Sequence, residues 1–421
     1  MALNSDNDTS AVLLPPASPP LRSSGGVCSP RVRTLAAVLC GAASVSTLIW
    51  ATLAASQGTA SGGGGGGGSN APQLRVVVNT WWPGSSAAAY SLLAANYSAV
   101  DSAVAGCVAA EKSFAFGDHT VGPDGSPDFS GETTLDALLC DGATQDVGAV
   151  AYLRNVSSAI LAARAVMRFT RHTLLAGDGA TALAAQLGGQ PAASISGAHD
   201  AAEVAGWRGG GCQPNYYVPA TALGANTSCG PFEPVPQPSP TPLPPSLHAG
   251  AAGGGWRPLA AARAADAPHR RAGWATLENH DTLGLCALDA AGSLAAAVTS
   301  NGANHKVPGR VGDAPVIGAG GYASDEAGGC AAATGDGDIT QRFLPAFVAT
   351  ENMRNGMAPA AACEDAVRRI MRHVTDFAIG IVCLNARGEW AAAGHGWTFS
   401  YCAAAPSTGG EPTCVHVKPL T

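Results

Sequence analysis

Apolar positions along the chain predict a folded unit that begins near residue 74. The run LRVVVNT, Leu74–Thr80, has the apolar content of a buried strand, and VGAVAYL, Val147–Leu153, is a second such run. Between them, the alanine-rich stretch Ser85–Lys112 contains few helix breakers and predicts a helix. The stretch Asn155–Gly177 predicts a further helix.

A stretch rich in proline and glycine, residues 234–271, interrupts this pattern. Proline lacks the N–H that helices and sheets use, and glycine adds flexibility, so we expect a disordered or loosely held loop. Regular structure resumes near Thr282 and continues nearly to the C-terminus. The chain is therefore suited to be cut in front of the strand that Thr282 leads.

A hairpin is predicted where the structure resumes. The apolar runs TLGLCAL and SLAAAVTS flank a turn-like tetrapeptide, Asp289–Gly292. A turn centred on its two alanines places Thr282 opposite Thr299, beside Ser300. Hydroxyl pairs across a hairpin are common in ordinary sheets, so this pair alone does not indicate chemistry.

The N-terminal region contains one long apolar segment, residues 34–56, preceded by Arg31 and Arg33. It is long enough to span a bilayer, and the small residues at its end also fit a signal-peptidase site. We therefore expect a cytosolic or n-region at 1–33, a signal peptide or signal anchor at 34–56, and a glycine-rich tether at 57–73. A buried core helix is the other interpretation of 34–56.

The positive charge before this segment places the rest of the chain in the lumen of the secretory pathway. Three N-x-S/T sequons, a weak signal by themselves, lie on that side, at Asn96, Asn155 and Asn226.

Composition excludes some functions. Charged residues make up 13% of the 421 residues and the formal net charge is −7, so the surface does not suit nucleic acid. The 12 cysteines contain no C-x-x-C pair, which argues against a zinc protein but permits disulfides in an oxidising compartment. We expect neither a metal nor a cofactor.

Two loops carry candidate chemistry. In GRVGDAP, Arg310 and Asp313 match the charged ends of a free amino acid, because arginine grips a carboxylate with two hydrogen bonds and aspartate holds an ammonium group. A surface ion pair is the plainer interpretation. In ATGDGD, Ala333–Asp338, a threonine hydroxyl and a glycine N–H at a loop-to-helix junction suit an oxyanion hole, although a lone G-x-G is weak evidence.

The order of the motifs HDTLG, SNG, GRVGDAP, GGYA and ATGDGD resembles the glycosylasparaginase (aspartylglucosaminidase) family, within the type-2 asparaginases and N-terminal-nucleophile hydrolases. NTWWPGSSAAAYSLL, GETTLDALLCDGATQDVGAVAYLRNV and CQPNYY extend the resemblance, which covers about residues 74–230 and 282–388. It implies an α/β (α+β) fold, the four-layer αββα sandwich of these hydrolases.

The resemblance also implies self-cleavage. The Thr282 hydroxyl attacks the carbonyl of Asp281, which follows His280, and water hydrolyses the resulting ester. The products are a large (alpha) chain, 74–281, and a small (beta) chain, 282–421. The new N-terminal threonine carries an amine with a pKa of about 7.7–8 that serves as its base.

By the same resemblance, Thr282 is the nucleophile, Ser300 supports it, and Thr334 with Gly335 forms the oxyanion hole. Substrate-binding roles fall on Trp81 (or its neighbour Trp82), Arg310, Val311, Gly312, Asp313, Thr334, Gly335, Asp336 and Gly337. Two positions depart from the family pattern. Asn279 replaces the usual glycine before His-Asp-Thr, which puts in doubt the strain behind self-cleavage, and Ser300 replaces the usual threonine but keeps the hydroxyl.

The cysteines divide into bridges and thiols. The resemblance implies the disulfides Cys212–Cys229 and Cys363–Cys383, while Cys402 and Cys414 are placed to close a terminal hairpin. Four others lie among apolar or small residues, and we expect buried thiols there: Cys107, Cys140, Cys286 and Cys330.

The implied function is hydrolysis of the bond between asparagine and N-acetylglucosamine in glycoprotein degradation. The implied partners are the two cleaved chains and a second copy of that unit, and the implied compartment is the lysosome or vacuole, with 34–56 as a candidate anchor. One alternative is an isoaspartyl peptidase/L-asparaginase. Another is an uncleaved, membrane-tethered relative that binds a ligand without turnover.

Overall fold

The computed structural model describes residues 74–113, 119, 121–187, 192–217, 220–222, 229–234 and 282–421. Several predictions concern residues outside these ranges: 1–33, 34–56, 57–73, most of 234–271, 279–281 and Asn226. Among the described residues, no helix is long and apolar enough to cross a membrane. All described residues belong to one compact unit, Asn70–Thr421.

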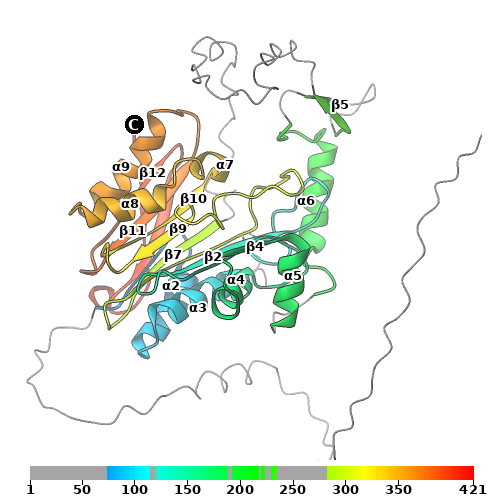
Figure 1. Cartoon of the computed structure of the whole chain (residues 1–421). Helices are drawn as coiled ribbons and strands as arrows, with labels where there is room; N and C mark the ends of the chain where they lie inside the picture. The colour runs from blue at the N-terminus through cyan, green and yellow to red at the C-terminus, as the bar shows by residue number, and fades with distance from the viewer. Residues whose placement is uncertain are drawn as a thin grey trace, which may run out of the picture. The chain divides into compact units, whose positions relative to one another are not determined.

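Two β-sheets stack face to face in this unit (Figure 1). The larger sheet has the order β14-β13-β1-β7-β8-β2-β3-β4, and its only parallel pair among the described strands is β3–β4. The smaller sheet has the order β12-β11-β10-β9. A separate small hairpin joins β5 (Ala220–Ala222) to β6 (Phe232–Pro234). The strands of the larger sheet are β1 (Val76–Asn79), β2 (Leu135–Asp141), β3 (Val147–Leu153), β4 (Leu174–Ala176), β7 (Thr282–Leu288), β8 (Leu294–Ser300), β13 (Phe399–Ala404) and β14 (Thr413–Val417); those of the smaller are β9 (Gly321–Ser324), β10 (Gly329–Gly335), β11 (Ile379–Asn385) and β12 (Trp390–His395).

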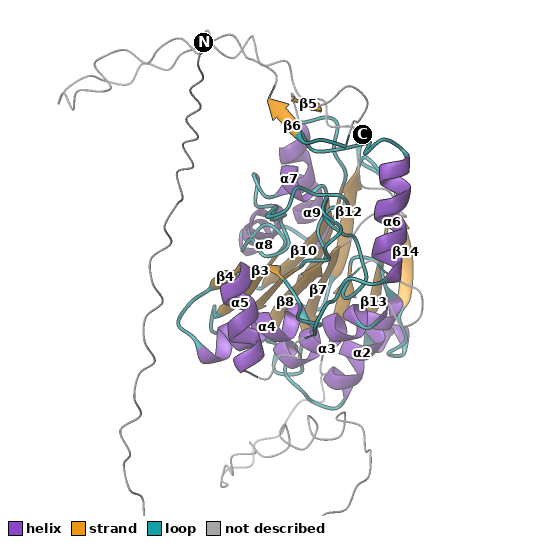
Figure 2. Ribbon diagram, turned by 90° about the vertical axis from the view of Figure 1, so that its right-hand side faces the viewer, coloured by secondary structure: helices purple, strands orange, loops and turns teal. Residues whose placement is uncertain are grey.

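Helices cover the outer face of each sheet, as the turned view also shows (Figure 2). The larger sheet is covered by α2 (Pro83–Ala94), α3 (Ala99–Glu111), α4 (Ala159–Phe169) and α5 (Gly177–Gln186), and the smaller by α8 (Pro345–Arg354) and α9 (Pro359–Met371). Two further helices, α6 (Ala198–Gly209) and the short α7 (Gly337–Thr340), lie near one end of the sandwich. The predicted four-layer αββα sandwich is thus confirmed.

The layers explain why the strands are almost continuously apolar. Successive side chains of a strand point to opposite faces, and both faces of each sheet are covered. Val77 packs under the helices of the larger sheet, whereas its neighbour Val78 packs between the two sheets. Leu139 and Leu138 divide in the same way.

The two predicted helices in the first half are each shorter than expected. The stretch 85–112 forms two helices, because Asn96 adopts a left-handed φ of 64° and Ser98 caps α3 by accepting a hydrogen bond from the backbone of Asp101. In the stretch 155–177, α4 is followed by β4, which pairs with β3, and α5 begins only at Gly177.

The hairpin register differs by one residue from the prediction. Thr282 lies directly opposite Ser300, and Thr299 lies opposite Leu283. The turn contains one more residue than expected, because Asp289 Oδ1 accepts hydrogen bonds from the backbone of Ala291 (2.9 Å) and Ser293 (3.0 Å). A one-residue shift exchanges the two faces of a strand, so it decides which hydroxyl meets Thr282.

The disulfides at Cys212–Cys229, Cys363–Cys383 and Cys402–Cys414 are present as predicted, and Cys107 and Cys140 are buried thiols. The prediction of buried thiols at Cys286 and Cys330 was wrong, because these two residues form a disulfide. They lie on β7 and β10, in different sheets, with side chains in the layer between them. Nothing in the sequence showed that these strands face each other.

We expect this bridge to contribute strongly to stability. The chain-entropy cost of a closed loop of 44 residues corresponds to about 4 kcal/mol. The double variant Cys286→Ala/Cys330→Ala should lose about that much more free energy of unfolding than Cys107→Ala/Cys140→Ala, which removes two equally buried sulfurs. Denaturant unfolding without reductant measures both, and equal losses would contradict the prediction.

Candidate active site

Three polar side chains lie in one row across the middle of the larger sheet. Ser300 of β8 is directly opposite Thr282 on one side and Asp136 of β2 on the other. Directly opposed residues of antiparallel strands share a face, so the three side chains point the same way. Thr282 Oγ1 and Ser300 Oγ are 2.8 Å apart, within hydrogen-bond distance. The row places a hydroxyl pair at a strand end, with a carboxylate beside it.

Asp136 was not singled out from the sequence. The register of β2 against β3 shifts at this residue, and the opposing Tyr152 has a φ of 50° and donates its backbone N–H to Asp136 Oδ1 at 2.7 Å. Such irregularities in strand pairing are frequent beside active sites. Burial raises the pKa of Asp136, while the positive charges of Arg310 and Lys306 oppose this shift.

A cavity of about 380 Å³ opens over this row. One part of its lining follows residue 282 in the chain and includes Thr282, Ser300, Arg310, Gly312, Asp313, Gly335, Asp336, Gly337 and Asp338. Another part comes from α6 and the loop after it, and includes Glu203, Trp207, Gln213 and Tyr216. Figure 1 shows α6 and α7 on either side of the loops that connect β8 with β9. The predicted substrate residues therefore converge on one cavity, except as noted below.

Arg310 is held in a cradle of glycines. A Cβ atom on Gly312 would lie 2.7 Å from Nη1, and one on Gly302 or Gly337 would lie 3.0 Å from a guanidinium nitrogen. Larger residues at these positions would displace the guanidinium group. One glycine from each of SNG, GRVGDAP and ATGDGD thus lets the backbone approach Arg310 closely.

The partner of Arg310 is Asp338 rather than Asp313. Asp338 Oδ2 accepts hydrogen bonds from Nη2 at 3.1 Å and from Nε at 3.3 Å, and the arginine side chain is 14% exposed. No feature of ATGDGD in the sequence favours Asp338 over Asp336 as this partner. Because guanidinium carries five donors, this pairing leaves the group able to bind a second carboxylate.

Asp313 lies close by and is 2% exposed. Its Oδ2 accepts a hydrogen bond from Thr340 Oγ1 at 2.8 Å. A Cβ on Gly337 would lie 2.7 Å from its Oδ1, so that oxygen faces the cavity-lining loop. Burial raises the pKa of Asp313 to about 6, against the opposing hydrogen bond from Thr340 and the charge of Arg310. A cation bound here would restore the ionised form.

Thr334, at the end of β10, is fully buried, and its hydroxyl has no hydrogen-bond partner. An unpaired buried hydroxyl is costly and calls for an explanation, such as a role with substrate. Its neighbour Gly335 lines the cavity. Neither Thr334 nor Val311 is among the described residues that line it.

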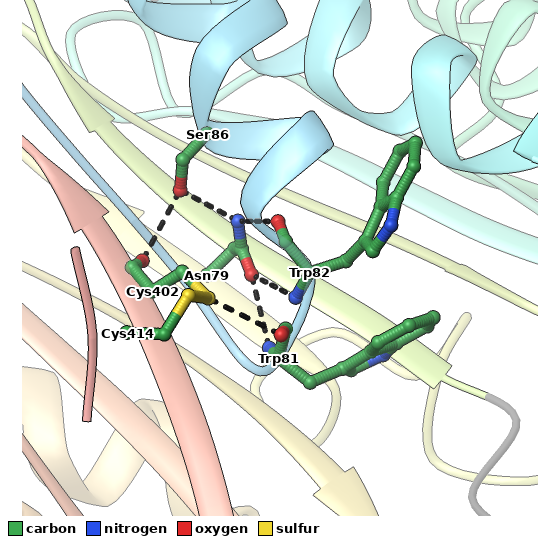
Figure 3. Close-up of a disulfide and its surroundings, with 6 residues drawn as sticks. All are labelled: Asn79, Trp81, Trp82, Ser86, Cys402 and Cys414. Carbon is green, nitrogen blue, oxygen red and sulfur yellow. Dashed lines mark hydrogen bonds between the residues drawn. A yellow bond between two sulfur atoms is a disulfide. The ribbon is translucent and has the colours of Figure 1, made fainter. Parts of the chain in front are cut away.

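Trp81, not Trp82, reaches Thr282. Its Nε1 donates a hydrogen bond to the Thr282 carbonyl at 3.2 Å, whereas a Cβ on Gly84 would lie 2.7 Å from the Trp82 ring. Asn79 Oδ1 holds the turn by accepting hydrogen bonds from the backbone N–H groups of Trp81 and Trp82, both at 2.9 Å (Figure 3). Neither tryptophan is among the described lining residues of the cavity. The predicted pocket-lining role of a tryptophan was therefore wrong, and Trp81 instead contacts the backbone of Thr282.

Asp124, His199 and Asp200 gather near the start of α6, with potential metal-ligand atoms within 4.8 Å of one another. Asp124 accepts hydrogen bonds from the backbone of Asp200 (3.1 Å) and His199 (3.4 Å). This is the arrangement of a helix cap, where the helix dipole disfavours a cation. The group is better explained as a cap than as a metal site.

The αββα sandwich with a threonine leading a central strand defines an N-terminal-nucleophile hydrolase. A family model described as asparaginase matches residues 79–218 and 246–411. A "probable isoaspartyl peptidase/L-asparaginase 3" of Arabidopsis thaliana is 41% identical over 72% of this chain and 79% of its own length. An N(4)-(beta-N-acetylglucosaminyl)-L-asparaginase of Rattus norvegicus is 39% identical over 73% and 79%. A putative enzyme of that same name from Drosophila melanogaster is 40% identical over 74% and 72%. The chain belongs to this asparaginase family and is an amidohydrolase.

Proposed function

We propose that the protein is a self-activating amidohydrolase that cleaves N4-(β-N-acetylglucosaminyl)-L-asparagine, releasing aspartate and the amino sugar. The proposal rests on the motif resemblance, the hydroxyl pair at Thr282 and the charges of the cavity. In the precursor, the Thr282 hydroxyl attacks the carbonyl of Asp281, and water hydrolyses the resulting ester.

Strand order supports association of the two products. In the larger sheet β7, which starts the later chain, lies between β1 of the earlier chain and β8, and β8 pairs in turn with β2 of the earlier chain. Hydrogen bonds between strands of different chains would hold the products together after the cut. We include a dimer of such units in the proposal.

Turnover then uses the free amine of Thr282 as base. The amine takes the proton of the Thr282 hydroxyl, whose oxygen attacks the side-chain carbonyl of the substrate. The Thr334 hydroxyl and the Gly335 N–H stabilise the developing oxyanion. The carbon–nitrogen bond breaks, the leaving amine takes up the proton, and water hydrolyses the aspartyl ester. Arg310 binds the α-carboxylate and Asp313 the α-ammonium group.

The negative charge of the cavity lining is the observation that favours glycosyl-asparagine over β-aspartyl dipeptides as the substrate. Its described lining contains five carboxylates and one permanent cation, Arg310; the carboxylates are those of Asp136, Glu203, Asp313, Asp336 and Asp338. Arg310 is committed to the aspartyl part of the substrate. A β-aspartyl dipeptide has a second carboxylate in its leaving group and would meet negative charge there, whereas an amino sugar is neutral.

The alternative is an isoaspartyl peptidase/L-asparaginase, and the name of the Arabidopsis thaliana relative favours it. Values of kcat/KM for glycosyl-asparagine and for β-aspartyl dipeptides, measured on purified mature protein, distinguish the two. A clear preference for the dipeptides would overturn the proposed substrate.

The pKa of Asp313 predicts a limb in the pH profile. Below about pH 6 the carboxylate is protonated in the free enzyme and no longer holds the substrate ammonium group, so kcat/KM should fall by a further factor of about ten per pH unit. Thr340→Val removes the hydrogen bond that favours the ionised form and should move this limb upward by about one pH unit.

Thr350→Val is the matched control, because Thr350 is equally buried but its hydroxyl has no hydrogen-bond partner. It should leave the limb near pH 6. A limb that stays in place in Thr340→Val would show that Asp313 does not cause it.

We also propose that the protein works in the lumen of the secretory pathway, in the lysosome or vacuole. The four disulfides among the described residues suit an oxidising compartment on the route there. Asn96, one of the predicted glycosylation sites, is exposed in the turn between α2 and α3, and Asn155 is partly exposed.

A further inference from the structure

One wall of the cavity is formed by residues of α6, and the proposed reaction assigns no role to it. The groups that would bind the aspartyl part of the substrate, Arg310, Asp313 and Thr334, all follow residue 282. The leaving group must then lie against other lining residues. Those of α6 and of the loop at 303–305 are the natural candidates, since they complete the cavity.

This wall is rigid and aromatic. The rings of Trp207 and His305 stack with centroids 4.4 Å apart and planes 5° apart. Trp207 Nε1 donates a hydrogen bond to the Pro214 carbonyl at 2.9 Å, and Phe129 contacts Trp207 edge-on at 5.1 Å. Trp207 is only 7% exposed. A ligand binding here would find the wall already ordered, which lowers the entropic cost of binding.

The polar groups on this wall are acceptors. Glu203 Oε1 accepts a hydrogen bond from Asn304 Nδ2 at 2.9 Å, and the buried Oδ1 of the same amide has no hydrogen-bond partner. The side chain of Glu203 is 41% exposed at the cavity. Hydroxyl groups are the donors that such acceptors suit.

Among the described lining residues of this wall, none carries a permanent positive charge. Burial lowers the pKa of His305, against the opposing charge of Glu203, so the imidazole is neutral near pH 7. Glu203 therefore gives this wall a net negative charge. A leaving group with a carboxylate is disfavoured here, and a neutral group rich in hydroxyls is favoured.

We propose that Glu203, Asn304 and the stacked Trp207–His305 pair form the leaving-group subsite and select a neutral, hydroxyl-rich amino sugar. This inference rests on the proposed function and extends it to named residues on both sides of the proposed cut. These residues act on specificity, since the reacting atoms lie at Thr282.

Glu203→Gln tests the subsite. The substitution keeps the size of the side chain and removes its charge. The readout is kcat/KM for N4-(β-N-acetylglucosaminyl)-L-asparagine divided by kcat/KM for L-asparagine, whose leaving group, ammonia, does not reach the wall. Loss of a charge-assisted hydrogen bond should lower this ratio about tenfold. The value for a β-aspartyl dipeptide should rise, because a repulsive charge is gone.

Glu364→Gln, the same change at an exposed position of α9 paired with Arg368, is the control and should leave the ratio unchanged. An unchanged ratio in Glu203→Gln, with a wild-type enzyme that cleaves glycosyl-asparagine, overturns the subsite alone. A wild-type enzyme that cleaves L-asparagine but not glycosyl-asparagine overturns both the subsite and the proposed function.

Discussion

Replacement of Thr282 by alanine should abolish both self-cleavage and hydrolysis. The same hydroxyl is proposed to attack Asp281 in the precursor and the substrate in the mature enzyme, and alanine leaves nothing in its place. We expect kcat to fall by roughly four orders of magnitude or more, as for other nucleophile deletions. A denaturing gel should show one full-length band in place of two chains, and an assay of released aspartate should show no turnover.

Thr282→Ser is the matched control, since it keeps the hydroxyl that lies 2.8 Å from Ser300 Oγ. It should still be cleaved and should retain activity. A Thr282→Ala protein that yields two chains would contradict the assignment of the nucleophile. A wild-type protein that stays full length after passage through the secretory pathway would favour the alternative of an uncleaved binding protein.

Arg310→Lys should separate maturation from turnover. Lysine keeps the charge but loses the planar pair of donors that grips a carboxylate, and the precursor presents no free α-carboxylate to this residue. Self-cleavage should therefore largely persist, while kcat/KM should fall by roughly tenfold to a hundredfold, the loss expected for one charge-assisted hydrogen bond. Gel analysis and steady-state kinetics on the same preparation measure the two effects.

The ion pair with Asp338 complicates this prediction in a testable way. If Arg310 serves only to neutralise Asp338, a lysine would do so as well and hydrolysis would stay intact. The amino-acid clamp would then be wrong. Arg354→Lys controls for the substitution itself, because Arg354 is paired with Glu326 and Glu351 on the surface, away from the cavity.

Local sequence signals predicted the elements of the fold well where those elements depend on near neighbours. The apolar runs at Leu74–Thr80 and Val147–Leu153 are strands, and the hairpin that begins at Thr282 is present. The loop with Arg310 and Asp313 was singled out by its own charged residues, and the four-layer architecture was implied by the family resemblance. Apolar runs, turns and charged loops are formed by residues that are close together in the sequence, so they can be recognised without the structure.

Helix ends and strand register were harder to predict from the sequence. The prediction of one helix at 85–112 did not anticipate that Ser98 caps a second helix. The predicted register of the hairpin differed by one residue, because the side chain of Asp289 stabilises a longer turn. Both errors involve a few side-chain hydrogen bonds, whose energies are small compared with the apolar pattern that guided the prediction.

The sequence by itself determined the apolar strands at Leu74–Thr80 and Val147–Leu153 and the residues of the motifs that follow Thr282. Only the tertiary structure decided which distant residues meet. It joined Cys286 to Cys330 across two sheets, placed Asp136 in a row with Ser300 and Thr282, and brought α6 to the cavity. The physical reason is that apolar patterning specifies that a face is buried, but not against what. That choice depends on the packing of whole sheets and helices, to which residues far apart in the chain contribute together.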